Sequence, residues 1–149
     1  MAATAKPDWG AHALAALEGA GYRSSAPRTA VVETMANEGC GVSARELADR
    51  LSDRGIGQAS IYRTLELLDQ LRLVQRYDVG EGLARYEPVF PNGEHHHHVV
   101  CDRCGAVTQF EDDQLEQAID RLSRRLDFTV DAHEVVLRGE CPVCRARAR

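Results

Sequence analysis

The chain has 149 residues, of which 44% are apolar and 28% are charged, a composition typical of one ordinary globular domain or two small ones. No apolar run is long enough to span a membrane, and residues 1–8 lack the apolar core of a secretory signal. We therefore expect a cytoplasmic protein without a membrane segment. The net charge of −5 means that DNA binding would have to use a local basic surface rather than overall charge.

Three helices are expected in the first part of the chain. The first covers residues 8–17, and the second covers 27–35, because Pro27 suits a first helical position. The third begins at a capping box, in which Ser43 caps the helix and Glu46 returns a hydrogen bond three residues later.

A longer helix is expected over residues 58–72, since Ile61 and Leu65 begin an apolar stripe at helical spacing. The period then changes from that of a helix to that of a strand. Residues 73–77 and 83–87 predict two strands joined by a glycine-rich turn, which is a hairpin.

This order of elements predicts a winged helix–turn–helix domain over residues 1–88, with the helix after the turn entering the major groove of DNA. Candidate DNA-contacting residues lie at the start of that helix and around Pro27, and they are Ser60, Tyr62, Arg63, Arg23 and Arg28. Arginine can contact a guanine edge or hold a phosphate. Alternatively, these are solvated charges, Tyr62 packs in the core, and the unit binds proteins rather than DNA.

Residues 89–94 contain proline and glycine and predict a hinge. Residues 95–149 then predict a small second domain. Its expected elements are strands through Val99–Val100, over 106–110 and over 128–137, an amphipathic helix from Asp112 or Asp113 to Leu126, and a frayed basic end over 145–149. Such a small unit leaves sheet edges exposed, which favours a homodimer.

Two Cys-x-x-Cys pairs bracket the second domain, and their residues are Cys101, Cys104, Cys141 and Cys144. Two such pairs can close a tetrahedral zinc site, so we expect one structural zinc ion. A redox pair would not need its duplicate, and a reducing cytosol disfavours disulfides. Cys40 is left over as a free thiol or an accessory ligand.

The expected fold class is α+β, an N-terminal winged helix–turn–helix domain plus a small C-terminal α/β dimerisation domain with structural zinc.

Four consecutive histidines, residues 95–98, precede the first cysteine pair. Because side chains alternate along a strand, His95 and His97 face one way and His96 and His98 face the other. Each pair needs further ligands, and the candidates are Glu116 and His133 for the first face and Glu87 for the second. Mixed nitrogen and oxygen ligands suit Zn(II), Fe(II), Mn(II) or Ni(II). Alternatively, the run binds metal adventitiously and His133 packs in the core.

An enzymatic function is not expected. A zinc hydrolase needs an open coordination position and a general base, and it often carries a His-Glu-x-x-His helix. The sequence has no such helix, and Glu94 is the one candidate base beside the histidine run.

Along nearly its whole length the chain resembles the ferric-uptake-regulator family of metal-responsive bacterial repressors. The segments that carry the resemblance are Arg23 to Arg28 with Pro27, Val42-Ser43-Ala44, Ser60-Ile61-Tyr62-Arg63-Thr64-Leu65, His95 to His98, Cys101-x-x-Cys104-Gly105, His133 and Gly139-x-Cys141-x-x-Cys144. Their order and spacing make the resemblance specific.

The resemblance implies a homodimer whose metal-bound form clamps two winged helices onto an A·T-rich palindromic operator. It implies structural zinc on the four paired cysteines, a second metal site on His95, His97, Glu116 and His133, and a regulatory hinge site on Glu87, His96 and His98. The regulatory ion would be Zn²⁺ or Fe²⁺. The expected function is therefore that of a metal-responsive repressor of metal-ion homeostasis. The alternative is a zinc-stabilised protein-interaction module without specific DNA binding.

The chain departs from the family pattern around the hinge site. Iron-type members have a histidine where this chain has Gly41, and zinc-type members typically have a hinge cysteine, which is missing between Arg76 and Glu94. Peroxide-sensing members use an aspartate where this chain has Gln109. The remaining hinge ligand could come from Cys40, Asp78, Glu81 or water. The four-histidine run favours zinc over iron as the ion sensed.

Overall fold

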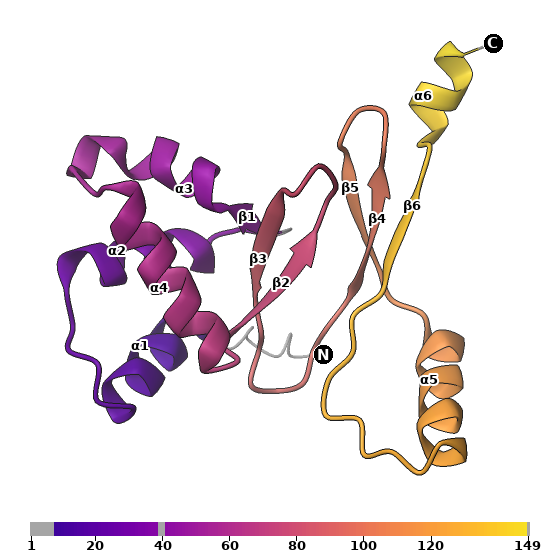
Figure 1. The fold of residues 1–149 in the computed structure, drawn as a ribbon, viewed down its shortest axis with the longest axis horizontal. Coiled ribbons are helices and arrows are strands. Elements are labelled where there is room, and N and C mark those ends of the chain that lie inside the picture. Colours follow the sequence, from indigo (N-terminus) through magenta and orange to yellow (C-terminus); the bar gives the residue numbers. More distant parts are fainter. Residues whose placement is uncertain (1–7, 39–40, 149) are drawn as a thin grey trace, which may run out of the picture. The chain divides into compact units, whose positions relative to one another are not determined.

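The protein is described by a computed structural model that covers residues 8–38 and 41–148. The chain splits into two compact units between Glu94 and His95 (Figure 1). The elements of the first unit are α1 (Trp9–Gly19), α2 (Ala26–Ala36), β1 (Val42–Ser43), α3 (Ala44–Leu51), a 3-10 turn (Ser52–Arg54), α4 (Gln58–Gln70), β2 (Val74–Asp78) and β3 (Ala84–Pro88).

Side-chain caps begin the first three helices. Asp8 accepts a hydrogen bond from the Ala11 N–H at 3.1 Å and so caps α1. The capping box of α3 is confirmed, with distances of 3.1 Å from the Glu46 N–H to Ser43 Oγ and 2.8 Å from the Ser43 N–H to Glu46 Oε2. Helix α2 begins one residue earlier than predicted, because Ser25 is its cap.

The end of α4 differs from the prediction of a helix through residue 72. The helix ends at Gln70, and Arg72 has a left-handed φ of 56°. The Leu73 N–H then donates to the carbonyl of Leu68 at 2.8 Å, which closes the helix end and directs the chain into β2. An apolar stripe does not reveal this stop, because the stripe continues past it.

The predicted hairpin is present, and a third strand joins it. The order in the sheet is β1-β3-β2, with antiparallel pairing throughout. Strand β1 was expected to be part of the start of α3, because its two residues are too few to show alternation. In its register, Ser43 lies opposite Arg85.

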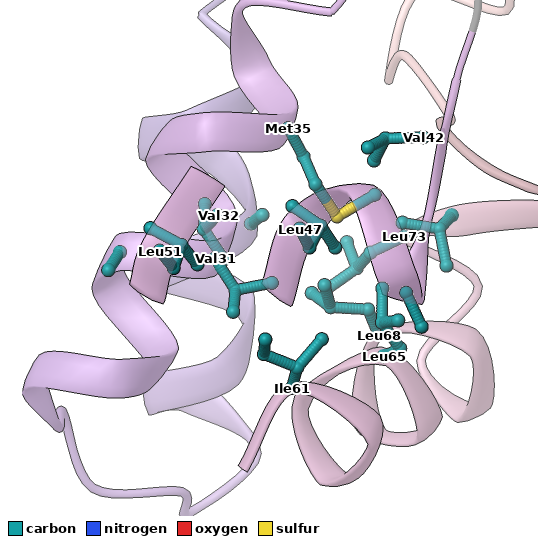
Figure 2. Packing of buried hydrophobic residues seen from close by; sticks show 14 of the residues in the cluster. Val31, Val32, Met35, Val42, Leu47, Leu51, Ile61, Leu65, Leu68 and Leu73 are labelled. Carbon is teal, nitrogen blue, oxygen red and sulfur yellow. The ribbon is translucent and has the colours of Figure 1, made fainter. Parts of the chain in front are cut away.

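The core of the first unit is apolar and lies between α2, α3 and α4 (Figure 2). It includes Val31, Met35, Leu47, Ile61, Leu65 and Leu68, which are fully buried. The buried Trp9 indole donates a hydrogen bond to the carbonyl of Leu73 at 2.9 Å and ties α1 to the start of β2. Packing of this kind makes the unit a winged helix–turn–helix held together by its own core.

The second unit contains β4 (His97–Cys101), β5 (Val107–Phe110), α5 (Asp113–Arg125), β6 (Val136–Gly139) and α6 (Pro142–Arg147). The strand order is β5-β4-β6, with β5 antiparallel and β6 parallel to the central strand. Helix α5 begins at Asp113, one of the two predicted starts, and Asp112 is its cap.

Two predictions for the second unit were wrong. Residues 128–135 form no strand, although the last two residues of the predicted 128–137 segment belong to β6. Strand β4 begins only at His97, and within residues 128–135 it pairs with the Val135 carbonyl, which accepts from the His98 N–H at 3.1 Å. Residues 145–147 of the basic end are not frayed, because they belong to α6 (Pro142–Arg147), which Cys141 caps by accepting from the Cys144 N–H.

The apolar face of α5 is largely uncovered. Helix α5 has no buried residue, and the exposed fractions of Leu122 and Leu126 are 44% and 57%. Phe128, in the connection that follows, is 70% exposed. Within the described ranges, every helix is too short or too polar to cross a membrane.

Candidate metal centres and DNA-facing residues

The four paired cysteines come together at one end of the second unit. Cys101 ends β4, Cys104 lies in the turn after it, and Cys141 and Cys144 lie at the start of α6. Their sulfur atoms all lie within 4.8 Å of one another, and none forms a disulfide. The Asp102 N–H donates to the Gly139 carbonyl at 2.8 Å and holds the two segments side by side.

The surroundings of the four thiols shift their pKa values in opposite directions. Hydrogen bonds from backbone N–H groups, first that of Cys141, lower the pKa of Cys101 to about 6. The pKa of Cys144 is raised to about 12 by its hydrogen bond to the Cys141 sulfur and by burial. Four clustered thiols cannot all ionise together unless a positive ion neutralises them. Their number, spacing and chemistry fit Zn²⁺, which would be held by the four sulfur atoms.

A second cluster joins β4, α5 and the segment before β6. The Glu116 carboxylate contacts three imidazoles, with distances from Nε2 of 2.6 Å for His97, 2.9 Å for His133 and 3.3 Å for His95. The Nε2 atoms of His95 and His133 are 3.3 Å apart. All four candidate ligand atoms lie within 4.8 Å of one another.

The charge on Glu116 suits a metal ligand. Burial raises its pKa, but hydrogen bonds from His97 and His133 outweigh burial and lower the pKa to about 2. His97 is 2% exposed, and its Nδ1 has no hydrogen-bond partner among the described residues. One carboxylate and three imidazoles form a donor set that fits Zn²⁺, Fe²⁺ or Mn²⁺. His133 is therefore part of a polar cluster rather than an isolated core residue.

The other two histidines lie on the opposite face of the run. The ring centroids of His96 and His98 are 5.0 Å apart, and His98 is fully buried. The run thus alternates as a strand does, although β4 itself starts at His97. Glu87, the third predicted hinge residue, lies on β3 of the first unit, opposite Gln75.

Position 41 cannot supply a side-chain ligand in this conformation. Gly41 has a φ of +76°, and a Cβ added there would lie 3.0 Å from both the Tyr77 hydroxyl and the Tyr86 carbonyl oxygen. A histidine at this position would therefore be strained. Cys40, the other nearby candidate, lies outside the described residues. The Asp78 carboxylate accepts from the Gly80 N–H at 2.6 Å within the wing turn.

The predicted DNA-contacting residues gather around the exposed face of α4. Arg28, Ser60 and Arg63 line one surface pocket of about 450 Å³. The Arg28 guanidinium lies 5.8 Å from the centre of the Tyr22 ring and donates to the Arg23 carbonyl. Sequence reasoning did not single out Tyr22, because a lone aromatic residue in a connection carries no periodic signal.

Tyr62 is 52% exposed, so the alternative that it packs in the core is wrong. The Arg63 Nε–H donates to the Ala59 carbonyl at 3.2 Å, which leaves the rest of its guanidinium available to a partner. Glu66 and Gln70 lie in the same pocket, one and two turns further along the exposed face.

A winged helix–turn–helix unit followed by a unit of clustered thiols, imidazoles and a carboxylate defines a metal-dependent DNA-binding regulator. The sequence model of the ferric uptake regulator family matches residues 19–138. The chain belongs to this family. Its members are metal-responsive transcription regulators, and this is the function of the present chain as well.

Known relatives match over most of their length. The ferric uptake regulation protein of Bacillus subtilis is 33% identical over 135 residues, which cover 88% of this chain and 91% of the relative. That of Neisseria meningitidis serogroup A is 32% identical over 141 residues, or 91% and 95% of the two chains.

Solved structures have the same fold. The crystal structure of the Vibrio cholerae ferric uptake regulator matches with a TM-score of 0.73 and 33% identity, over 85% of this chain and 98% of that one. A structure of the Pseudomonas aeruginosa regulator with manganese matches with a TM-score of 0.74 and 26% identity, over 87% and 97%.

Proposed function

We propose that the chain is a zinc-responsive repressor of metal-ion homeostasis that binds operator DNA as a metal-loaded homodimer in the cytoplasm. The observation that carries the proposal is the division of the histidine run into two pairs on opposite faces. One pair would complete a stabilising site with Glu116 and His133, and the other pair, His96 and His98, would bind the regulatory ion.

In this proposal the four cysteines hold structural zinc, and the regulatory ion binds His96, His98 and Glu87. Glu87 ends the wing hairpin just before the hinge, and the two histidines begin the second unit. An ion held by all three would restrict the first unit relative to the second. Gly41 has no side chain, so the remaining coordination position would be filled by Cys40, Asp78, Glu81 or water.

The proposed switch is a population shift. Metal binding favours the arrangement in which two DNA-binding units match the spacing of the operator half-sites. A hundredfold gain in DNA affinity requires metal to favour that arrangement by about 2.7 kcal/mol. One or two metal–ligand bonds that exist only in the favoured arrangement are enough for this.

Tyr62 and Arg63, near the start of α4, would read base edges in the major groove, together with Ser60. Arg28 and Arg23 would hold the phosphate backbone. The exposure of Tyr62 and the shared pocket of Arg28, Ser60 and Arg63 support this assignment. The DNA would be an A·T-rich palindrome.

The uncovered apolar side chains of the second unit support a homodimer. They are Leu122, Leu126, Phe128, Val130 and Leu137, each at least 44% exposed. A second copy of the chain that covered this surface would remove apolar area from water. The two symmetric winged helices would then face the two halves of a palindrome.

Iron is the second candidate for the sensed ion. The relatives in Bacillus subtilis and Neisseria meningitidis are both named ferric uptake regulation proteins. Nitrogen and oxygen ligands accept Fe(II) as well as Zn(II), which makes Fe²⁺ the alternative to zinc at the hinge site.

The test is a selection of binding sites from a library of random DNA duplexes, carried out with zinc, with Fe²⁺ under anaerobic conditions, and without added metal. The wild-type protein should enrich one palindromic sequence only with its own metal. Arg63→Ala should enrich nothing. His96→Ala should stay folded but lose the metal dependence, whereas His12→Ala, an exposed histidine on α1, should behave like the wild type.

A wild-type protein that enriches no sequence with any metal would support the protein-interaction alternative. A His96→Ala variant that still responds normally to zinc would remove the hinge site from the mechanism. Enrichment with Fe²⁺ alone would make iron the ion sensed.

A further inference from the structure

Arg85, on the wing strand β3, contacts the first helix of the helix–turn–helix pair. Its Nη2 donates to the Gly41 carbonyl at 3.1 Å and lies 3.1 Å from Glu46 Oε2 and 3.3 Å from Oε1. The same guanidinium nitrogen thus holds the chain just before β1 and a side chain in the first turn of α3.

Glu46 is fixed from the other side as well. Its Oε2 accepts the Ser43 N–H at 2.8 Å in the capping box. Ser43 in turn lies opposite Arg85 in the β1–β3 register. Strand β3, strand β1 and the start of α3 are therefore joined by a closed set of contacts, which we name the Arg85 latch: Arg85, Glu46, Ser43 and the Gly41 carbonyl.

The latch lies on the same strand as a proposed metal ligand. Arg85 and Glu87 are two residues apart on β3, so their side chains leave the strand on the same face. A displacement of β3 caused by an ion at Glu87 would move Arg85, and through it the start of α3. Helix α3 packs against the recognition helix α4.

We propose that Arg85 is a positioning residue that transmits metal binding at Glu87 to the helix–turn–helix pair. This inference rests on the proposed function, because it assumes that Glu87 binds the regulatory ion. It adds a route by which that ion sets the orientation of the recognition helix, beside the restriction of the two units.

A role in stability alone explains the latch poorly. The Arg85 and Glu46 side chains are 23% and 38% exposed, and partly exposed ion pairs add little to stability. The Arg85 Nε–H is buried and has no hydrogen-bond partner among the described residues, so removal of the guanidinium also removes an unsatisfied donor.

Two variants open the latch in different ways. Arg85→Met removes the guanidinium and keeps an apolar side chain of similar length. Glu46→Gln removes the charge but keeps the cap, because glutamine serves in a capping box as glutamate does. The matched control is Arg50→Met. Arg50 lies on α3, as Glu46 does, and pairs with Glu38 on the surface.

The measured quantity is the ratio of DNA affinity with zinc to DNA affinity without zinc, using the duplex selected by the wild-type protein. Arg85→Met and Glu46→Gln should each reduce this ratio at least fivefold, with zinc-free DNA affinity and zinc content unchanged. The double variant should be no worse than either single variant, because both open the same latch. Arg50→Met should keep the full ratio.

Three results would count against the inference. If Arg85→Met keeps the full ratio of DNA affinity with zinc to that without zinc, the inference is overturned. The proposed function still stands in that case, provided that the wild-type protein responds to zinc. A loss of DNA affinity that is equal with and without zinc would make the latch merely structural. A wild-type protein with no zinc response would overturn the proposed function, and the inference with it. Fluorescence of Trp9, the single tryptophan, checks that each variant is folded.

Discussion

The two units of this chain are stabilised by different chemistry. In the first unit the buried side chains are almost all apolar and form one cluster that extends from α1 to β2. In the described part of the second unit the buried side chains are Val100 and four potential metal ligands, His97, His98, Cys101 and Cys144. The first unit therefore has an apolar core of its own, whereas the second depends on what its ligands bind.

The difference has a physical cause in composition. An apolar residue gains free energy when it leaves water, whatever its partner. A buried thiol or imidazole gains little until it binds an ion, and metal binding then becomes part of the folding free energy. We expect the first unit to keep its fold when metal is removed and the second unit to lose it.

The largest expected effect follows from breaking the cysteine site. Cys101→Ser removes one of four thiolates from a type of site worth about 10 to 16 kcal/mol in small zinc domains. The zinc content should fall, and amide hydrogens of the second unit should exchange at rates close to those of an unfolded chain. Those of α2, α3 and α4 should stay protected. Hydrogen-exchange mass spectrometry and elemental analysis measure both.

The control for this variant is Val143→Ser, in the same Cys-x-x-Cys segment. Val143 is 59% exposed and is no ligand, so zinc content and exchange should match the wild type. If Cys101→Ser kept its zinc and its protection, the second unit would be stable without its thiolate site, and the contrast between the units would be wrong.

A substitution in the apolar core should destabilise the first unit and leave the zinc content unchanged, and its effect should be smaller than that of Cys101→Ser. Leu65→Ala removes a fully buried side chain from the first unit and should cost about 2 to 5 kcal/mol of unfolding free energy. Zinc content should not change. Urea denaturation followed by Trp9 fluorescence measures the loss, because the single tryptophan is buried in this unit.

Leu83→Ala is the matched control, because Leu83 is 56% exposed at the wing and its loss should change stability by less than about 0.5 kcal/mol. Equal effects of Leu65→Ala and Leu83→Ala would mean that the cluster in Figure 2 does not dominate the stability of the first unit.

Local chemistry explains which features could be predicted from the sequence. Helix caps can be predicted because each capping hydrogen bond joins residues only three positions apart, as in Asp8 with Ala11 and Ser43 with Glu46. The spacing of the cysteine pairs and the alternation of the histidines are local in the same sense. The cysteine site and the two faces of the histidine run follow from such features, whereas the contacts of Glu116 with His97 and His133 depend on long-range packing.

The errors lie where long-range pairing decides. Residues 128–135 alternate in sequence, yet an alternating segment needs a strand beside it, and β4 reaches back only as far as the Val135 carbonyl. Strand β1 is the converse: its two residues become a strand only because β3 is available. The strain that a side chain at position 41 would meet is likewise invisible in sequence, since it would come from the positive φ and from contacts with Tyr77 and Tyr86.

The smallest expected effect concerns the pH dependence of the histidine cluster without its ion. The pKa of Glu116 is about 2 in the folded chain, against an ordinary value of 4.5. The folded state thus favours the carboxylate: Glu116 stabilises the second unit fully above pH 4.5 and loses this contribution as the pH falls toward 2. The effect is small, because the Glu116 side chain is one-third exposed and water screens its contacts.

Glu116→Gln should lack this pH dependence, whereas Glu111→Gln, at an exposed position before α5, should retain it. Carbon NMR of the Glu116 carboxyl, in protein stripped of all but the cysteine-bound metal, measures the pKa directly. The titration is read only over the pH range in which the cysteine-bound metal stays in place, because acid protonates thiolates and releases their metal. A Glu116 carboxyl that begins to protonate within that range would mean that the three imidazoles do not hold the carboxylate, and that this cluster forms only when an ion brings it together.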